Sequence, residues 1–176
     1  MGLLFPLSIV PAITWHRNPM NTHFGAPRSG GFPVHGACDL VVPAGTEVLA
    51  MEDGRIIRGP YQFVTYRQGT TQTTTYAIDV EHPAFIARYC EISHALPQGV
   101  HAGATVNQGQ VIAVVGQQVG HSMLHFEMFG EPGRLGILTD RSADRYLYVP
   151  QANYQRREDL LDPTDYLDAC IGPGAS

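Results

Sequence analysis

The feature that most constrains the fold of this chain is a series of short β-type runs separated by turn residues. The 19 glycines and 13 prolines among 176 residues indicate many turns. In the run 76–80, apolar residues at 76, 78 and 80 alternate with Ala77 and Asp79, which is the pattern of a half-buried strand. We predict a mostly β protein with antiparallel sheets and with strands at residues 47–50, 54–58, 76–80, 85–92, 111–115 and 124–129.

The segments between and after these strands complete the predicted architecture. Residues 69–75 are rich in Thr and Gln and predict a long hairpin loop. Near the C-terminus we expect a short helix at residues 157–161 that stops before Pro163. A chain of 176 residues can bury a core, and we expect one domain over residues 1–176 with its C-terminal segment packed on the sheet.

Charge and hydropathy exclude several partners. The net charge of −5 argues against nucleic acid, because binding phosphates requires a basic patch. No stretch approaches the roughly 20 apolar residues of a membrane-spanning helix, so we expect no membrane span. No Lys or Arg precedes the apolar residues of the N-terminus, and Pro6 and Pro11 interrupt them, so we expect no secretory signal peptide.

Two motifs supply residues that can bind a metal. His35 and Asp39 form an H-x-x-x-D pattern, and His125 lies in the run Leu-His-Phe-Glu at 124–127. Two His and one Asp are a ligand set that zinc accepts while it keeps a fourth position for water. A straight strand would hold His35 and Asp39 too far apart to share an ion, so we expect a bend at Gly36. Glu127 shares a strand face with His125 and is placed to orient its ring.

Further segments stand around these motifs. They are Phe24-Gly25-Ala26-Pro27-Arg28, Gly30-Gly31-Phe32-Pro33-Val34, Pro43-Ala44-Gly45-Thr46 and the run 106–116. In the order and spacing of these segments and the two motifs, the chain resembles the lysostaphin-like zinc metallopeptidases, the family of LytM-type peptidoglycan endopeptidases. The resemblance covers residues 24–130 as the core, with 131–176 as a C-terminal extension. It implies an antiparallel β core of two packed sheets with a groove, and it makes His35, Asp39 and His125 the ligands of one zinc ion.

The chain departs from this family at two catalytic positions. Family members carry H-x-H before Phe-Glu, and Met123 replaces the first His with a thioether that has no titratable proton. They also carry Tyr-x-His-Leu on the preceding strand, where the matching run 89–92 has Glu91 at the His position. A carboxylate beside a zinc-bound water is the general base in the H-E-x-x-H enzymes, so we predict Glu91 as the base. His94 is a reserve candidate, although alternation turns it away from Glu91.

The resemblance, together with these residues, implies a zinc-dependent peptidoglycan hydrolase that cleaves a peptide bond in the stem peptide or the cross-bridge. Arg28 and Asn21 are candidates to anchor the substrate, and otherwise are surface loop residues. One alternative is a catalytically inactive zinc-binding member that acts as a binding or regulatory module, which Met123 favours and Glu91 opposes. Another is a zinc peptidase that acts on ordinary proteins.

The expected absence of an export signal suggests how a wall hydrolase would reach its substrate. Contact-dependent secretion machines inject antibacterial effectors made without signal peptides into rival bacteria. By this analogy we expect synthesis in the cytoplasm, action in the periplasm of a target cell, and a cognate immunity protein. The analogy also favours a D,D-endopeptidase that cuts between D-Ala and diaminopimelate over cleavage of a glycine bridge.

The cysteines are expected to have structural roles. Cys38 and Cys90 each precede a predicted site residue, so alternation predicts that both face away from the site as small apolar residues. Cys170 would form a disulfide with one of them only in an oxidising compartment.

Overall fold

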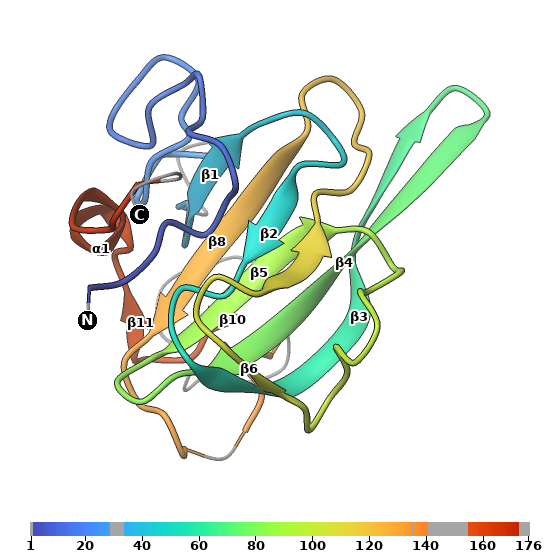
Figure 1. The fold of residues 1–176 in the computed structure, drawn as a ribbon. Coiled ribbons are helices and arrows are strands. Elements are labelled where there is room, and N and C mark those ends of the chain that lie inside the picture. Colours follow the sequence, from blue (N-terminus) through green and yellow to red (C-terminus); the bar gives the residue numbers. More distant parts are fainter. Residues whose placement is uncertain (1, 29–33, 135, 141–154, 173–176) are drawn as a thin grey trace.

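The computed structural model describes residues 2–28, 34–134, 136–140 and 155–172 (Figure 1). Two parts of the sequence discussed above lie partly outside the described residues. They are the family-like segments, at residues 29–33, and the C-terminal extension, at residues 135, 141–154 and 173–176.

One antiparallel sheet forms the body of the protein. Its strands follow the order β1-β8-β5-β4-β3-β6, and β11 pairs with β8 beyond the end of β1. The bounds are β1 Cys38–Val41, β3 Gly54–Gln68, β4 Thr71–Glu81, β5 Ile86–Ile92, β6 Thr105–Val106, β8 Met123–Phe129 and β11 Leu160–Leu161. Strands far apart in the sequence therefore lie side by side, with β1 against β8 and β8 against β5 (Figure 1).

A second, two-stranded sheet covers one face of the large sheet. It consists of β2 (Glu47–Leu49) and β7 (Val111–Val114). Its buried Val48 and Ile112 belong to the same apolar core as Ile78, Tyr89 and Phe126 of the large sheet. A third pair, β9 (Thr139–Asp140) with β10 (Gln155–Arg156), forms a separate two-stranded sheet. The mostly antiparallel β fold predicted from the sequence is confirmed, and all six predicted strands are present.

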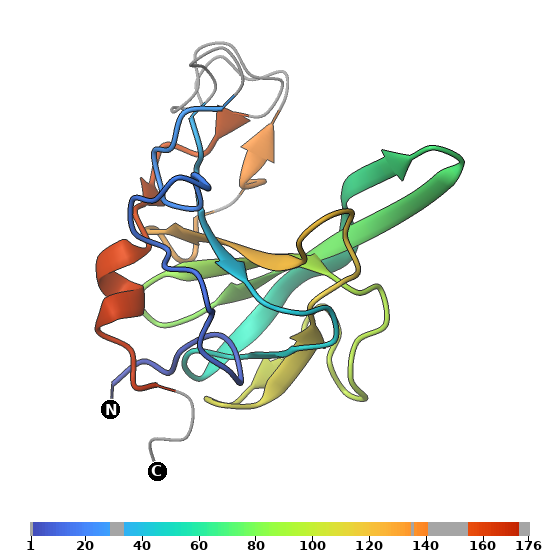
Figure 2. The same cartoon turned by 90° about the horizontal axis from the view of Figure 1, so that it is seen from above.

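The predicted loop at residues 69–75 is wrong. Strand β3 continues to Gln68 and β4 begins at Thr71, so the turn is only Gly69 and Thr70, and Gly69 takes the positive φ of 58°. Threonine is β-branched and favours strands, and Thr65 and Thr74 join their hydroxyl groups across the two strands at 3.0 Å. Figure 2 shows the resulting β3–β4 hairpin projecting beyond the sheet.

The predicted helix at residues 157–161 is also misplaced. Leu160 and Leu161 form β11 and pair with Phe129 and Met128, which gives their backbone a sheet partner. The C-terminal helix α1 spans Thr164–Asp168 and follows Pro163, because proline cannot donate a backbone hydrogen bond but is tolerated where a helix begins.

The C-terminal segment packs on the body of the protein, as expected. Leu167 of α1 is buried in the main core, and Trp15 Nε1 of the N-terminal segment donates a hydrogen bond to Asp168 at 2.9 Å. None of the described helices is long and apolar enough to cross a membrane.

Candidate active site

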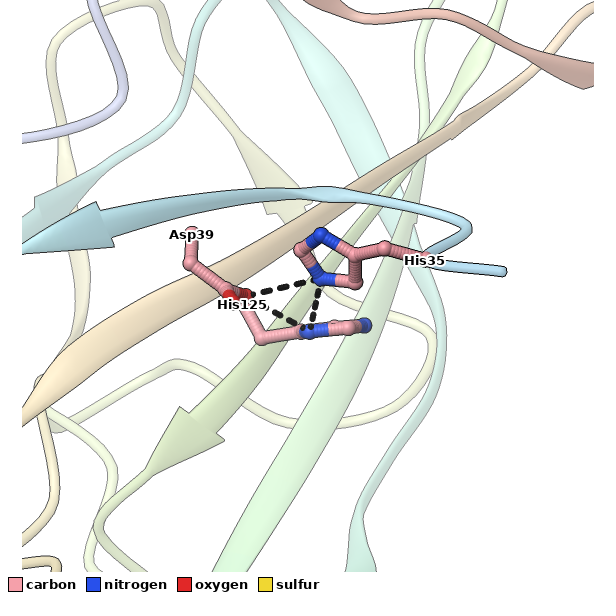
Figure 3. A group of neighbouring side chains, drawn as sticks. All are labelled: His35, Asp39 and His125. Atoms are coloured by element: carbon pink, nitrogen blue, oxygen red, sulfur yellow. Dashed lines mark hydrogen bonds and ion pairs between the residues drawn. The ribbon is translucent and has the colours of Figure 1, made fainter. Parts of the chain in front are cut away.

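The three predicted ligand residues converge on one point (Figure 3). Asp39 Oδ1 lies 3.0 Å from His35 Nε2 and 2.9 Å from His125 Nδ1, and these two ring nitrogens are 3.3 Å apart. His35 and Asp39 are buried and His125 is half-buried. Residues separated by up to 90 positions in the sequence thus aim one donor atom each at a shared space.

Strand pairing and a bend bring these side chains together. Asp39 of β1 is the direct cross-strand partner of His125 of β8, so both side chains lie on the same face of the sheet. His35 precedes β1, and the chain bends at Ala37, one residue after the bend expected at Gly36. The His35 N–H donates to the carbonyl of Ala26 at 2.8 Å, which fixes the loop before the bend.

The other polar atoms of these side chains have partners of their own. His35 Nδ1 lies 2.9 Å from the backbone carbonyl of His23, and His125 Nε2 lies 3.0 Å from Glu127 Oε1. Arg28 Nη2 donates to Asp39 Oδ2 at 3.0 Å. Such outer hydrogen bonds fix ring orientation and tautomer in metal sites. They leave His35 Nε2, Asp39 Oδ1 and His125 Nδ1 as the inward-facing donor atoms.

Burial and hydrogen bonding shift the protonation of all three groups. Burial lowers the pKa of His35, which favours the neutral imidazole that a metal requires. Burial opposes ionisation of Asp39, but hydrogen bonds from His125 and His35 hold its pKa well below the usual range. Burial also opposes the charging of His125, and hydrogen bonds to Asp39 and Glu127 outweigh it and raise its pKa to about 9.

The geometry fits a zinc ion. Zinc bonds of about 2.0–2.1 Å at tetrahedral angles separate neighbouring ligand atoms by about 3.3 Å. The separations among the three donor atoms, 2.9, 3.0 and 3.3 Å, approach this value. Two imidazoles and one carboxylate would hold the ion and leave its fourth position open, as in catalytic sites.

Glu91 faces the same pocket as His125. A pocket of about 620 Å³ opens beside His125, and Glu91, His125 and Phe63 are among the residues that line it. Glu91 Oε1 accepts a hydrogen bond from the Tyr66 hydroxyl, while Oε2 is buried without a partner among the described residues. Burial raises the pKa of this carboxyl above its usual range. An unpaired buried carboxylate oxygen beside a metal-ligand cluster is suited to accept a proton.

A β-bulge sets the direction of Glu91. Strand β4 pairs Tyr76 with Ile92 and Ala77 with Cys90, so Glu91 is an extra residue without a partner, and its φ is 67°. Non-glycine residues rarely adopt this conformation, and such strain gathers at functional sites. The Gly116 N–H holds the bulge by donating to the Glu91 carbonyl at 2.8 Å, and a Cβ on Gly116 would lie 3.0 Å from that oxygen.

The bulge overturns one sequence prediction about the cysteines. Cys90 pairs directly with His125 and therefore shares its face of the sheet, whereas alternation predicted that it would face away. Cys38 lies in the apolar core as predicted, and burial raises the pKa of its thiol to about 12. Cys38, Cys90 and Cys170 are all free thiols.

The remaining candidates lie at the edge of this arrangement. Met123 is half-buried on β8, and His94 packs against Tyr76 with the ring centroids 4.5 Å apart. Neither residue lines the pocket beside His125. Arg28 donates to Asp39 and to the Asn21 carbonyl at 3.1 Å. Substrate anchoring by Arg28 and Asn21 stays a prediction, and the contacts of Arg28 give it a role in holding Asp39.

Three residues of the site escaped the sequence analysis. Arg88 and Arg156 both donate to Glu127, at 3.1 and 2.8 Å, and Tyr66 donates to Glu91. Arg88 had a visible signal, because it is a charge within an otherwise apolar run before Glu91. Tyr66 and Arg156 had none, since both reach the site from segments remote in the sequence.

Solved structures share this architecture. The catalytic domain of the antimicrobial peptidase lysostaphin from Staphylococcus simulans has a TM-score of 0.51 at 19% identity, covering 82% of this chain and 88% of that chain. LytU has a TM-score of 0.51 at 18% identity, with coverage of 82% and 81%. A solution structure of lysostaphin has a TM-score of 0.55 at 18% identity and covers 88% of this chain. This chain spans 52%, or about half, of that lysostaphin chain. The comparison with curated proteins gives no match.

The match of this chain to a peptidase family model defines its class as a metallopeptidase, and the His–Asp–His cluster supplies side chains that could hold the metal. Residues 33–134, more than half of the chain, match the model of peptidase family M23. The chain belongs to peptidase family M23, and the resemblance found in the sequence is thereby confirmed.

Proposed function

We propose that this protein is a zinc-dependent peptidoglycan hydrolase that cleaves a peptide bond in the stem peptide or the cross-bridge. His35, Asp39 and His125 hold the ion, and Glu91 is the general base. The observation that carries the proposal is the position of Glu91, which lines the same pocket as His125 and whose Oε2 is buried without a hydrogen-bond partner among the described residues. Family membership and the lysostaphin-type fold support peptidase chemistry.

Each residue has a separate task in this scheme. Bound zinc supplies Lewis-acid chemistry, polarising a carbonyl oxygen and lowering the pKa of water. Glu91 accepts a proton from the attacking water and returns it to the leaving amine. Tyr66 holds the carboxylate of Glu91 in place through Oε1, and Glu127 holds the ring of His125.

A second candidate is a zinc-binding module without catalytic activity. Met123 favours it, because the residue at this position has no proton to transfer and does not line the pocket. Cleavage assays separate the two candidates.

Digestion of purified sacculi tests the proposal. The parent protein should release stem-peptide fragments detectable by mass spectrometry, and a chelator should stop the release. Glu91→Gln should keep the fold and the zinc but lose about 10²–10⁴-fold in rate, the range of general acid–base catalysis. Glu47→Gln, an exposed carboxylate on β2, is the matched control and should retain the parent rate. Parent-like turnover of Glu91→Gln would refute the base, and inactivity of the zinc-loaded parent would favour the binding module.

A further inference from the structure

Arg156 reaches the candidate site from a part of the chain outside the family match. The match ends at residue 134, whereas Arg156 belongs to the C-terminal segment 155–161, which contains β10 and β11. The Nε and Nη2 atoms of Arg156 lie 2.8 and 2.7 Å from Glu127 Oε1. Arg156 also lines the pocket that Glu91 and His125 share. A residue beyond the matched region therefore contributes to this site.

Arg156 contacts the same carboxylate oxygen that contacts the His125 ring. Glu127 Oε1 lies 3.0 Å from His125 Nε2, while Glu127 Oε2 accepts a hydrogen bond from Arg88 at 3.1 Å. A carboxylate accepts hydrogen bonds and does not donate them, so His125 donates through Nε2 and its Nδ1 faces Asp39 at 2.9 Å. Arg88 thus fixes one oxygen of Glu127, and Arg156 fixes the oxygen that sets the direction of the His125 ring.

The C-terminal segment is anchored by contacts that do not involve the Arg156 side chain. Arg157 is only 1% exposed, and its Nη2 donates to Asp159 Oδ2 at 2.7 Å and to the Glu131 carbonyl at 3.1 Å. The Gly130 N–H donates to the Asp159 carbonyl at 2.8 Å, and β11 pairs with the end of β8. These contacts hold the backbone of the segment beside the strand that carries His125.

The same segment packs on the bend that precedes β1. A Cβ placed on Gly36 would lie 3.4 Å from Leu160 Cδ2 and 3.5 Å from Arg156 Cγ, which is van der Waals contact. Gly36 directly follows the predicted ligand His35. The segment therefore contacts two chain elements that carry predicted metal ligands, the bend after His35 and the strand β8.

We propose that Arg156 is a positioning residue of the metal site, which holds Glu127 against His125 so that His125 Nδ1 is aimed at the ion. This proposal rests on the proposed function, because it takes the three predicted ligands as given, but it does not require cleavage. Outer hydrogen bonds of this kind contribute about 10–100-fold to metal affinity. Arg88 still holds Glu127 when Arg156 is replaced, so we expect the lower end, about 10-fold.

Zinc affinity and metal geometry test the role of Arg156. The parent and its variants are titrated with zinc in competition with a chromophoric chelator. The Co²⁺-loaded proteins are compared by visible absorption, which responds to the arrangement of the ligands around the ion. Arg156→Gln should bind zinc about 10-fold more weakly and should change the Co²⁺ spectrum. Arg156→Lys keeps the charge without the planar pair of donors, so it should bind zinc with intermediate affinity.

Two control variants separate positioning from stability. Arg67→Gln removes an exposed positive charge from β3 and should keep the zinc affinity and the Co²⁺ spectrum of the parent. Ile112→Val shortens a fully buried core residue of β7, so it should lower Tm without changing the affinity or the spectrum.

The outcomes distinguish this inference from the proposed function. Parent-like zinc affinity and Co²⁺ spectrum in Arg156→Gln would overturn the inference, even if Tm falls. If Arg156→Gln does not fold, parent-like affinity in Arg156→Lys overturns the inference and weaker affinity supports it. A parent that binds zinc without cleaving sacculi would refute the hydrolase, while the affinities still decide the role of Arg156. A parent that binds no zinc would overturn both.

Discussion

Replacing Glu127 by Gln removes one negative charge from the most enclosed part of the candidate site. Glu127 is fully buried, its Oε1 lies 3.0 Å from His125 Nε2, and its Oε2 accepts from Arg88 Nη1 at 3.1 Å. Arg156 Nε also donates to Oε1, at 2.8 Å. Glutamine has the same size as glutamate and keeps one oxygen that accepts a hydrogen bond from His125. Its amide nitrogen replaces the oxygen that faces Arg88, so two hydrogen-bond donors then face each other.

The expected loss follows from these contacts. Breaking a buried ion pair by removing one partner costs about 3–5 kcal/mol. Arg88 retains Asp79 at 3.2 Å, so we expect the lower end, about 3 kcal/mol. In a chain of this size each kcal/mol lowers Tm by about 2–4 °C, which gives a decrease of about 6–12 °C. Loss of the negative charge on the partner that orients His125 should also weaken zinc binding by about 10–100-fold.

Two measurements check both magnitudes. Thermal unfolding followed by circular dichroism in the presence of chelator gives the change in Tm, and competition with a chromophoric chelator gives zinc affinity. The control is Glu131→Gln, whose carboxylate pairs with Arg134 at 2.7 Å on the surface and should leave both values close to the parent's. A Glu127→Gln protein with parent-like Tm and zinc affinity would refute the role given to this carboxylate.

Four further outcomes are expected. Elemental analysis of protein purified without chelator should find about one zinc per chain, and Asp39→Ala should lose it; stoichiometric zinc in that variant would exclude Asp39 as a ligand. Burial raises the pKa of Glu91, so its contribution to stability is complete below its ordinary value of 4.5 and is lost as pH rises through the folded-state value. Glu91→Gln cannot ionise and should therefore gain stability over the parent across that window in urea titrations at stepped pH; a constant difference would contradict this. The protein should be harmless when expressed in the bacterial cytoplasm and lytic when exported to the periplasm, with lysis abolished in His125→Ala; equal toxicity in both compartments would point to a cytosolic target. Met123→Leu, a volume-conserving apolar change outside the pocket, should keep most cleavage activity and lose less than ~1.5 kcal/mol of stability, and a large loss of rate would assign Met123 a role at the site.

Part of the candidate site was readable in the sequence because its signals are local. The spacing of His35 and Asp39, and the period-two placement of His125 and Glu127 on one strand, require no knowledge of what lies across the sheet. The strands themselves follow from side-chain alternation, whereas the error at residues 69–75 came from composition. Composition there suggested a loop, and the cross-strand pairing of threonines that extends β3 and β4 is a non-local contact.

The sequence by itself indicated the six strands and the family and predicted which three residues would converge, because each is encoded in residue identity and spacing along the chain. Tertiary structure alone decided how charges meet across strands. Strand order and register bring Arg88 opposite Glu127 and bring Arg156 to the same carboxylate. They also bring Tyr66 within hydrogen-bond distance of Glu91. Glu91 is an extra residue in its strand and does not follow the regular alternation, so counting faces from Glu91 predicted the wrong face for the neighbouring Cys90.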